Sequence, residues 1–340
     1  MKKRVLYLDV LRIVACFGVI ANHTNFILKQ AETTADSMNR ATLLTGVIFM
    51  VLCKTAVTLF VMISGALLLK KQDDYKKNFK RIFRVAAVLF VFSAGYYLMG
   101  DYEHSPLDFI KTVTKINVTT AFWYLYLYLG ILVMLPVLQK MVAGFKKADY
   151  FYFLFFSLVV CSFSFVTDYN AHFSLPVFAT FVGVFILGYF LDSKVETDKY
   201  SKNIMTCLMV IVCLTVTAFL TAYTYRGVLL EKPDAYRLIV YDNIFYTFLS
   251  ACIFMLAKLW LGDGSDTKMT RFLCEIGACT FGIYLFSDAV IKILMPYFEK
   301  MAAACGMSVL FMVLLDASVF ICGLAVTWIL KRIKYINQFL

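Results

Sequence analysis

The sequence predicts an all-α integral membrane protein with about ten transmembrane helices and both termini in the cytoplasm. Of its 340 residues, 61% are hydrophobic and only 16% are charged, and the mean hydropathy is +0.78. A soluble domain has fewer apolar residues and more charged ones. Apolar runs of about 20 residues, the length that crosses a bilayer, also recur along the whole chain.

The apolar runs give the positions of the expected helices. They lie at residues 6–28, 46–69, 83–100, 120–139, 150–167, 175–191, 203–223, 240–261, 274–295 and 308–330. Only loops remain between them, so we expect residues 1–340 to form a single transmembrane domain with no separate soluble domain. The basic start of the chain is similar to a secretion signal, but Asp9 and Arg12 interrupt its apolar run and no small-residue cleavage motif follows. The first run is therefore interpreted as a retained helix.

The basic residues predict the orientation. With the N-terminus in the cytoplasm, about two thirds of the 33 lysines and arginines fall in or beside cytoplasmic segments, and about a quarter in outer ones. Lysine and arginine favour the cytoplasmic side of a membrane, so an even number of helices places both ends there. This topology accounts for the formal charge of +11 without a nucleic-acid partner. Most of the 10 cysteines lie in apolar runs without metal-binding spacing, so we expect neither disulfides nor a metal site.

The first helix carries three residues that are costly to bury in lipid, Asp9, Arg12 and His23. Asp9 and Arg12 are three residues apart, so they can pair on one face of the helix. His23 lies eleven residues beyond Arg12, which is roughly 16 Å along the axis and near the same face. We interpret this stripe as part of a functional site. A structural ion pair and a histidine bonded to a neighbouring helix are the alternative.

Other polar residues also fall within the expected helices. Lys54 must find a partner or reach the membrane surface, and Ser64 with Gly65 forms a small patch where helices can approach closely. Asp288 and Lys292 are four residues apart, a spacing that favours a structural pair within one helix.

The segment KKNFKRIFR, residues 76–84, is strongly basic. Its charge can simply anchor the topology. Arg81 and Arg84, however, are three residues apart and point the same way. Because guanidinium groups bind phosphate through two hydrogen bonds, the pair would suit a phosphate-rich ligand arriving from the cytoplasm.

Together these segments resemble the acyltransferase-3 family of membrane acyltransferases, in particular its branch of surface-polysaccharide O-acetyltransferases. The first helix, YLDVLRIVACFGVIANH, is similar to the opening motif of an arginine, ten residues and a histidine, here Arg12 and His23. LFVMISGALLL resembles the second-helix Ser-Gly motif, and KRIFR the Arg-x-x-Arg signature. AFWYLYLYLGILVMLPVL resembles the middle block that ends at Pro136, and FGIYLFSD the late Gly-Ile-Tyr-Leu motif. The motifs follow the family order over nearly the whole chain.

The chain departs from the family pattern at two places. Relatives often carry a histidine just after the late motif, where this chain has Phe286 and Ser287. Many members of the polysaccharide branch have another just before the middle tryptophan, where this chain has Ala121 and Phe122. These differences leave the acceptor open and, to a lesser extent, the activity. We expect no fused extracytoplasmic domain of the kind that some members carry.

The resemblance implies transfer of an acyl group, expected to be acetyl from cytoplasmic acetyl-CoA, to a hydroxyl of a cell-surface glycan or a related acceptor at the plasma membrane. A hydroxyl needs a base, and histidine has a suitable pKa. His23 is the candidate because His104 and His172 fall in expected outer loops. Direct transfer and a covalent acyl-enzyme both remain open.

The other expected roles follow from the same interpretation. Arg12 would bind or orient the acyl donor, with Asp9 fixing its position. Arg81 and Arg84 would bind the CoA phosphates. Residues expected to line the substrate cavity are Lys54, Ser64 and Trp123, and those able to contact a sugar from the outer segments are Tyr102, Glu103, Asp108 and Trp123.

Two other functions fit the charged residues within the helices. One is a transporter of a small solute or an amino acid, which would use intramembrane charges equally well. The other is a catalytically inactive membrane scaffold. Consumption of an acyl-CoA thioester distinguishes the enzyme from both.

Overall fold

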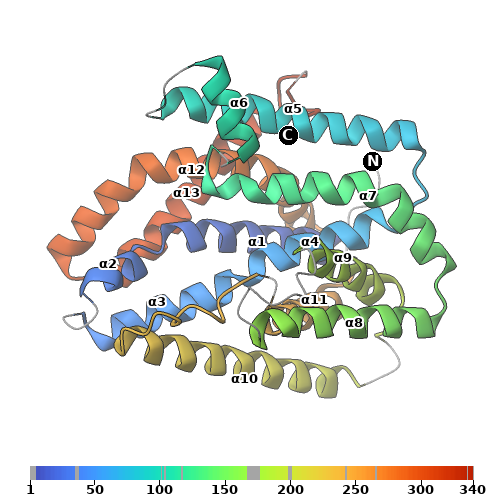
Figure 1. The fold of residues 1–340 in the computed structure, drawn as a ribbon, viewed down its shortest axis with the longest axis horizontal. Coiled ribbons are helices and arrows are strands. Elements are labelled where there is room, and N and C mark those ends of the chain that lie inside the picture. Colours follow the sequence, from blue (N-terminus) through green and yellow to red (C-terminus); the bar gives the residue numbers. More distant parts are fainter. Residues whose placement is uncertain are drawn as a thin grey trace. The chain divides into compact units, whose positions relative to one another are not determined.

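The computed structural model describes residues 5–34, 38–100, 102, 105–115, 118–166, 177–197, 201–241, 243–264, 266–334 and 336–339. Within these ranges the chain forms α-helices and one short 3-10 helix, without strands (Figure 1). Eight segments of this described part are long and apolar enough to cross a membrane. The all-α class of an integral membrane protein is therefore confirmed. The number ten and the cytoplasmic termini stay predictions, although α8 (Lys147–Val166) and α9 (Val177–Ser193) lie where the fifth and sixth helices were expected.

The chain divides into two compact units. The first comprises Met1–Leu67 and Lys146–Ala325, and the second comprises Leu68–Phe145 and Val326–Leu340. Besides α8 and α9, the helices that lie wholly or mainly in the first unit are α1 (Leu6–Thr24), α2 (Phe26–Thr34), α3 (Arg40–Cys53), α4 (Thr55–Leu68), α10 (Lys202–Leu229), α11 (Ile244–Leu261), α12 (Lys268–Cys305) and α13 (Ser308–Leu330). Those of the second are α5 (Tyr75–Met99), α6 (Pro106–Lys115), η1 (Thr120–Phe122) and α7 (Trp123–Gly144).

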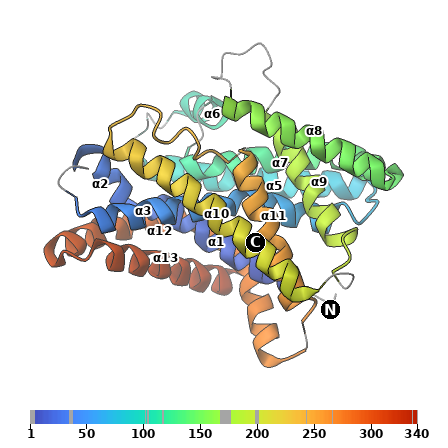
Figure 2. The ribbon, with the colours of Figure 1, turned by 90° about the horizontal axis from the view of Figure 1, so that it is seen from below.

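Helix α1 is central to the packing of the first unit, where it contacts α3, α11 and α12. Buried apolar side chains of α1, α2, α12 and α13 form one core cluster. A second cluster joins α2 and α3 to α10 and α11, and α3 lies along α10 in both ribbon views (Figures 1 and 2). The other face of α10 is apolar and exposed, with Leu208, Ile211 and Leu214 each more than half accessible. Such a face suits contact with lipid.

Two of the segments that can span the membrane are broken at a polar residue. The segment Leu6–Ala31 is interrupted at Asn25, where α1 ends and α2 begins. Asn25 donates to the backbone oxygen of Gly46 at 2.9 Å and accepts from the Leu28 amide. The segment Arg40–Leu68 is interrupted at Lys54, between α3 and α4. Backbone irregularity at membrane depth is tolerated only where protein or a water-filled cavity surrounds it.

Glycines allow α4 and α9 to approach closely. A Cβ atom on Gly65 would lie 1.8 Å from the backbone oxygen of Phe185, and one on Gly188 would lie 2.1 Å from that of Met62. The close approach expected at the Ser64-Gly65 patch is therefore confirmed. Small residues are the usual means by which membrane helices bring their backbones together.

The second unit is built on the contact between α5 and α7. Asn78 of α5 is buried and donates to the backbone oxygen of Leu132 in α7 at 2.7 Å. Farther along α5, the ring of Tyr96 packs edge-on against Phe122, with their centroids 5.3 Å apart. The glycine of α5, Gly95, has open space around it.

Several helices extend beyond the boundaries expected from hydropathy. Helix α5 begins at Tyr75 rather than at residue 83, so the basic segment 76–84 is helical. Helix α12 spans 38 residues where 274–295 was expected. The physical reason is that hydropathy detects only the apolar part of a helix, whereas lysine and arginine continue helices readily.

Candidate functional site

Asp9 and Arg12 form the ion pair that their spacing predicts. The distance from Arg12 Nη1 to Asp9 Oδ1 is 2.8 Å, and the side chains are 26% and 2% exposed, respectively. Gly277 of α12 lies directly over Asp9, because a Cβ atom there would be 2.8 Å from the Asp9 Cβ. The guanidinium group of Arg12 is thus paired with a buried carboxylate and remains partly accessible to solvent.

His23 lies in the last turn of α1, two residues before the break at Asn25. Helix α1 is continuous from Arg12 to His23, as expected. The imidazole is half-buried, and the charges of Asp288 and Lys54 act on it. No hydrogen bond joins it to another residue in the described part of the chain.

Lys54, at the break between α3 and α4, is held by an aromatic ring. Its Nζ lies 4.3 Å from the centroid of the Tyr241 ring. Asn22, next to His23 in α1, donates to the Tyr241 hydroxyl at 3.3 Å, and the Thr58 hydroxyl donates to the Tyr241 backbone oxygen at 3.5 Å. A chain of contacts therefore connects the end of α1 with Lys54 through Tyr241.

The Tyr241 ring does not balance the cost of burying Lys54. A cation–π contact stabilises by about 0.5–2 kcal/mol, whereas removing an ammonium ion from water costs several kcal/mol. Lys54 is half-buried, and within the described ranges no carboxylate forms an ion pair with it.

Two carboxyl groups complete this polar centre. Asp288 of α12 pairs with Lys292 at 3.0 Å, which confirms the expected pair. Asp316 of α13 is fully buried and hydrogen-bonded to the Thr24 hydroxyl. Its Oδ2 atom has no hydrogen-bond partner within the part of the chain that is described. Asp316 is not among the site residues predicted from the sequence, although it is the one charged residue between Ser308 and Leu330.

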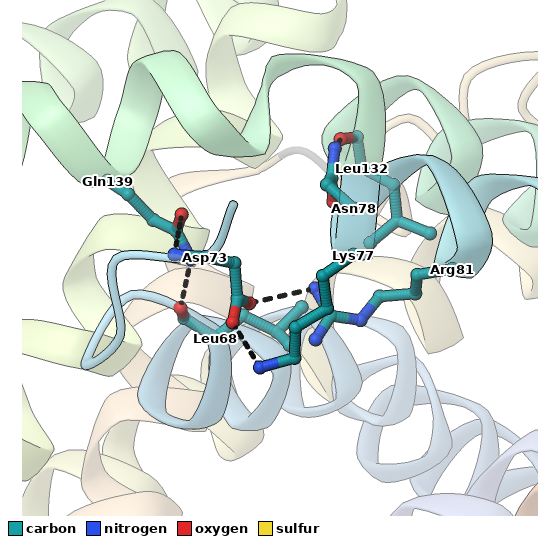
Figure 3. Close-up of polar contacts among 7 residues, drawn as sticks. All are labelled: Leu68, Asp73, Lys77, Asn78, Arg81, Leu132 and Gln139. Atoms are coloured by element: carbon teal, nitrogen blue, oxygen red, sulfur yellow. Dashed lines mark hydrogen bonds and ion pairs between the residues drawn. The ribbon is translucent and has the colours of Figure 1, made fainter. Parts of the chain in front are cut away.

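Arg81 and Arg84 belong to the second unit, at the start of α5. Arg81 Nη1 lies 3.1 Å from Asp73 Oδ2, and Lys77 Nζ lies 2.5 Å from Asp73 Oδ1. Arg84 is exposed. Lys77 and Arg81 both point toward Asp73 in the loop before α5 (Figure 3).

Gln139 of α7 fixes that loop. It donates to the backbone oxygen of Leu68 at 2.8 Å and accepts from the Asp73 amide at 3.2 Å (Figure 3). Burial of Asp73 opposes its ionisation, but the hydrogen bonds from Lys77 and Arg81 outweigh this effect and lower the pKa of its carboxyl group. Asp73 therefore stays charged at neutral pH and orients Arg81.

The remaining expected site residues are less closely connected. Ser64 lies ten residues beyond Lys54, roughly 15 Å along α4, so it does not share the polar centre of Lys54. Trp123 is the first residue of α7, in the second unit. There, Tyr97 donates to Asp108 at 2.6 Å and stacks on Tyr102. Glu103, His104 and His172, which were also named from the sequence, lie outside the described ranges.

Long apolar helices that enclose charged and polar side chains are typical of a polytopic membrane protein. The acyltransferase-3 family model, described as an acyltransferase domain, matches residues 5–332. The chain therefore belongs to this family of membrane acyltransferases. No curated protein and no solved structure matches the chain. Within the described residues, no group of three or more His, Cys, Asp or Glu side chains is arranged to hold a metal ion.

Proposed function

We propose that the protein is a membrane O-acyltransferase that moves an acetyl group from cytoplasmic acetyl-CoA to a hydroxyl of a cell-surface glycan or a related acceptor. The observation that carries this proposal is the position of His23. It is half-buried at a break in a membrane-spanning segment, beside charged groups of other helices. A hydroxyl is a weak nucleophile at neutral pH, and a histidine in that position can accept its proton as it attacks the thioester.

Asp288 supports this role through its charge. When His23 accepts the hydroxyl proton, its imidazole becomes positive; the charge of Asp288 favours that state, whereas the charge of Lys54 opposes it. The CoA thiolate that leaves the thioester then takes up the same proton. The general base is regenerated in each cycle without a further reagent.

The arginines suit the donor, which is a substrate with three phosphate groups on its nucleotide end. Arg81 directs one nitrogen, Nη1, at Asp73, and Arg84 is exposed, so guanidinium groups remain for phosphate. We assign Arg81 and Arg84 to the CoA phosphates. Arg12, paired with Asp9, is assigned to binding or orienting the donor at its pantetheine arm or phosphates.

The test measures both products of the reaction with purified protein in nanodiscs. The protein receives acetyl-CoA with a labelled acetyl group and a crude cell-surface glycan extract. We expect one free thiol for each labelled ester formed on the glycan, and no ester without the protein. A transporter would move label while the thioester stays intact, and a scaffold would bind without releasing thiol. Either result would reject the proposal.

A further inference from the structure

Lys54 is a half-buried cation of the first unit to which the proposed reaction has so far given no role. It lies at the break of the segment Arg40–Leu68, and Tyr241 holds its ammonium group from one side. Asn22, which precedes His23 in α1, donates a hydrogen bond to the Tyr241 hydroxyl. The proposed base and the lysine thus stand at two helix breaks that one tyrosine connects.

Gly18 of α1 packs against the break between α3 and α4. A Cβ atom on Gly18 would lie 3.1 Å from the Ala56 Cβ and 3.6 Å from the backbone oxygen of Cys53. Helix α1 therefore packs directly on the residues that flank Lys54. His23 lies five residues farther along α1, and the charge of Lys54 acts on its imidazole.

We propose that Lys54 is a further catalytic residue, whose ammonium group stabilises the negative charge that develops on the thioester carbonyl oxygen. This inference rests on the proposed acyltransferase function. The acceptor hydroxyl gives its proton to His23 and its oxygen bonds to the carbonyl carbon, so that the carbonyl π electrons move onto the oxygen facing Lys54. When that charge returns, the carbon–sulfur bond breaks and the thiolate takes the proton from His23. The products are the ester and free CoA.

Such a role explains why a lysine occupies this place. A positive group in a site shielded from water acts most strongly on charge that appears in the transition state. The neutral Tyr241 ring orients the ammonium group without neutralising it, whereas a carboxylate in the same position would compete with the oxyanion.

The experiment compares Lys54→Met with Lys54→Arg and with a matched control, Lys202→Met. Lys202 also lies over an aromatic ring, with its Nζ 4.0 Å from the Trp260 centroid, but it is exposed at the start of α10. Thiol release from acetyl-CoA with the glycan extract gives kcat and the donor KM for each variant in nanodiscs. We expect Lys54→Met to lower kcat about 10²–10³-fold, the loss typical of one oxyanion donor, with little change in KM. Lys54→Arg, which keeps the charge, should recover at least part of the loss, and Lys202→Met should match the wild type.

The contrary results distinguish a failure of the proposed function from a failure of the role assigned to Lys54. If the wild type releases no thiol, the proposed function falls and the role of Lys54 falls with it. If the wild type is active and folded Lys54→Met is equally active, only the inference fails. A raised KM with normal kcat would make Lys54 a donor-binding residue and overturn the inference. If Lys54→Met does not fold, Lys54→Arg decides, because a folded but inactive arginine variant would contradict a role that needs only positive charge.

Discussion

The two units hold their charged groups in different ways. In the second unit, Asp73, Lys77 and Arg81 lie within nine residues of one another and their cations are partly exposed. In the first unit, Lys54 and Tyr241 are 187 positions apart in numbering, and the groups around them come from α1, α12 and α13. A local basic group suits a ligand that arrives from water. A centre assembled from distant helices suits chemistry that must be shielded from water.

The difference extends to the packing of the helices. The first unit requires backbones in contact, as between Gly65 and Phe185. In the second unit, a Cβ atom on Gly95 would meet no heavy atom of another segment within 4 Å. The site in the first unit therefore depends on a tightly fixed scaffold, whereas the basic group at the start of α5 is held by side-chain hydrogen bonds within its loop and to Gln139 of α7.

The largest effect on stability should come from Gly65→Ala, because its Cβ would overlap the Phe185 backbone oxygen. Overpacking of this kind costs about 3 kcal/mol, roughly a hundredfold in the folding equilibrium. Gly95→Ala is the matched control and should leave stability unchanged or slightly raised. Thermal unfolding of both variants in nanodiscs measures the difference. Equal melting temperatures would show that α4 and α9 are not in backbone contact.

A smaller effect is expected from the double variant Arg81→Ala/Arg84→Ala. Losing two guanidinium groups that bind phosphate should raise the KM for acetyl-CoA about tenfold and leave the KM for the acceptor unchanged. The double variant Lys146→Ala/Lys147→Ala removes the same charge from exposed positions elsewhere and serves as the control. If both double variants change the donor KM equally, the effect is one of net charge rather than of a phosphate site.

The smallest effect concerns the pH dependence of the loop before α5. The pKa of Asp73 is lowered in the folded protein, so its pairing stabilises the fold fully above the unfolded value of about 3.9. That contribution is lost as the pH falls through the lower folded pKa. The melting temperature of Asp73→Asn should therefore lie a few degrees below that of the wild type at pH 7. The gap should close under acid conditions, and a gap that persists at the lowest pH would contradict the pairing.

Much of the architecture could be predicted from the sequence, because hydropathy and short spacings are local properties. The pairs Asp9–Arg12 and Asp288–Lys292 follow from helical periodicity alone. Tyr241 could not be predicted, since no periodicity places a residue between α10 and α11 beside Lys54. Asp316 could have been identified as an acid in an apolar helix, but its contact with Thr24 depends on how α1 and α13 pack. Tertiary contacts between distant segments are what local patterns do not contain.

One substitution tests directly whether His23 is the general base. His23→Gln keeps a side chain of similar size that cannot accept the proton, so acceptor-stimulated thiol release by the folded variant should fall about 10²–10⁴-fold in kcat. Binding of acetyl-CoA, measured in the same nanodiscs, should stay at the wild-type level. A folded His23→Gln protein that acetylates the glycan at a near-normal rate would contradict the account and place the base elsewhere in the molecule.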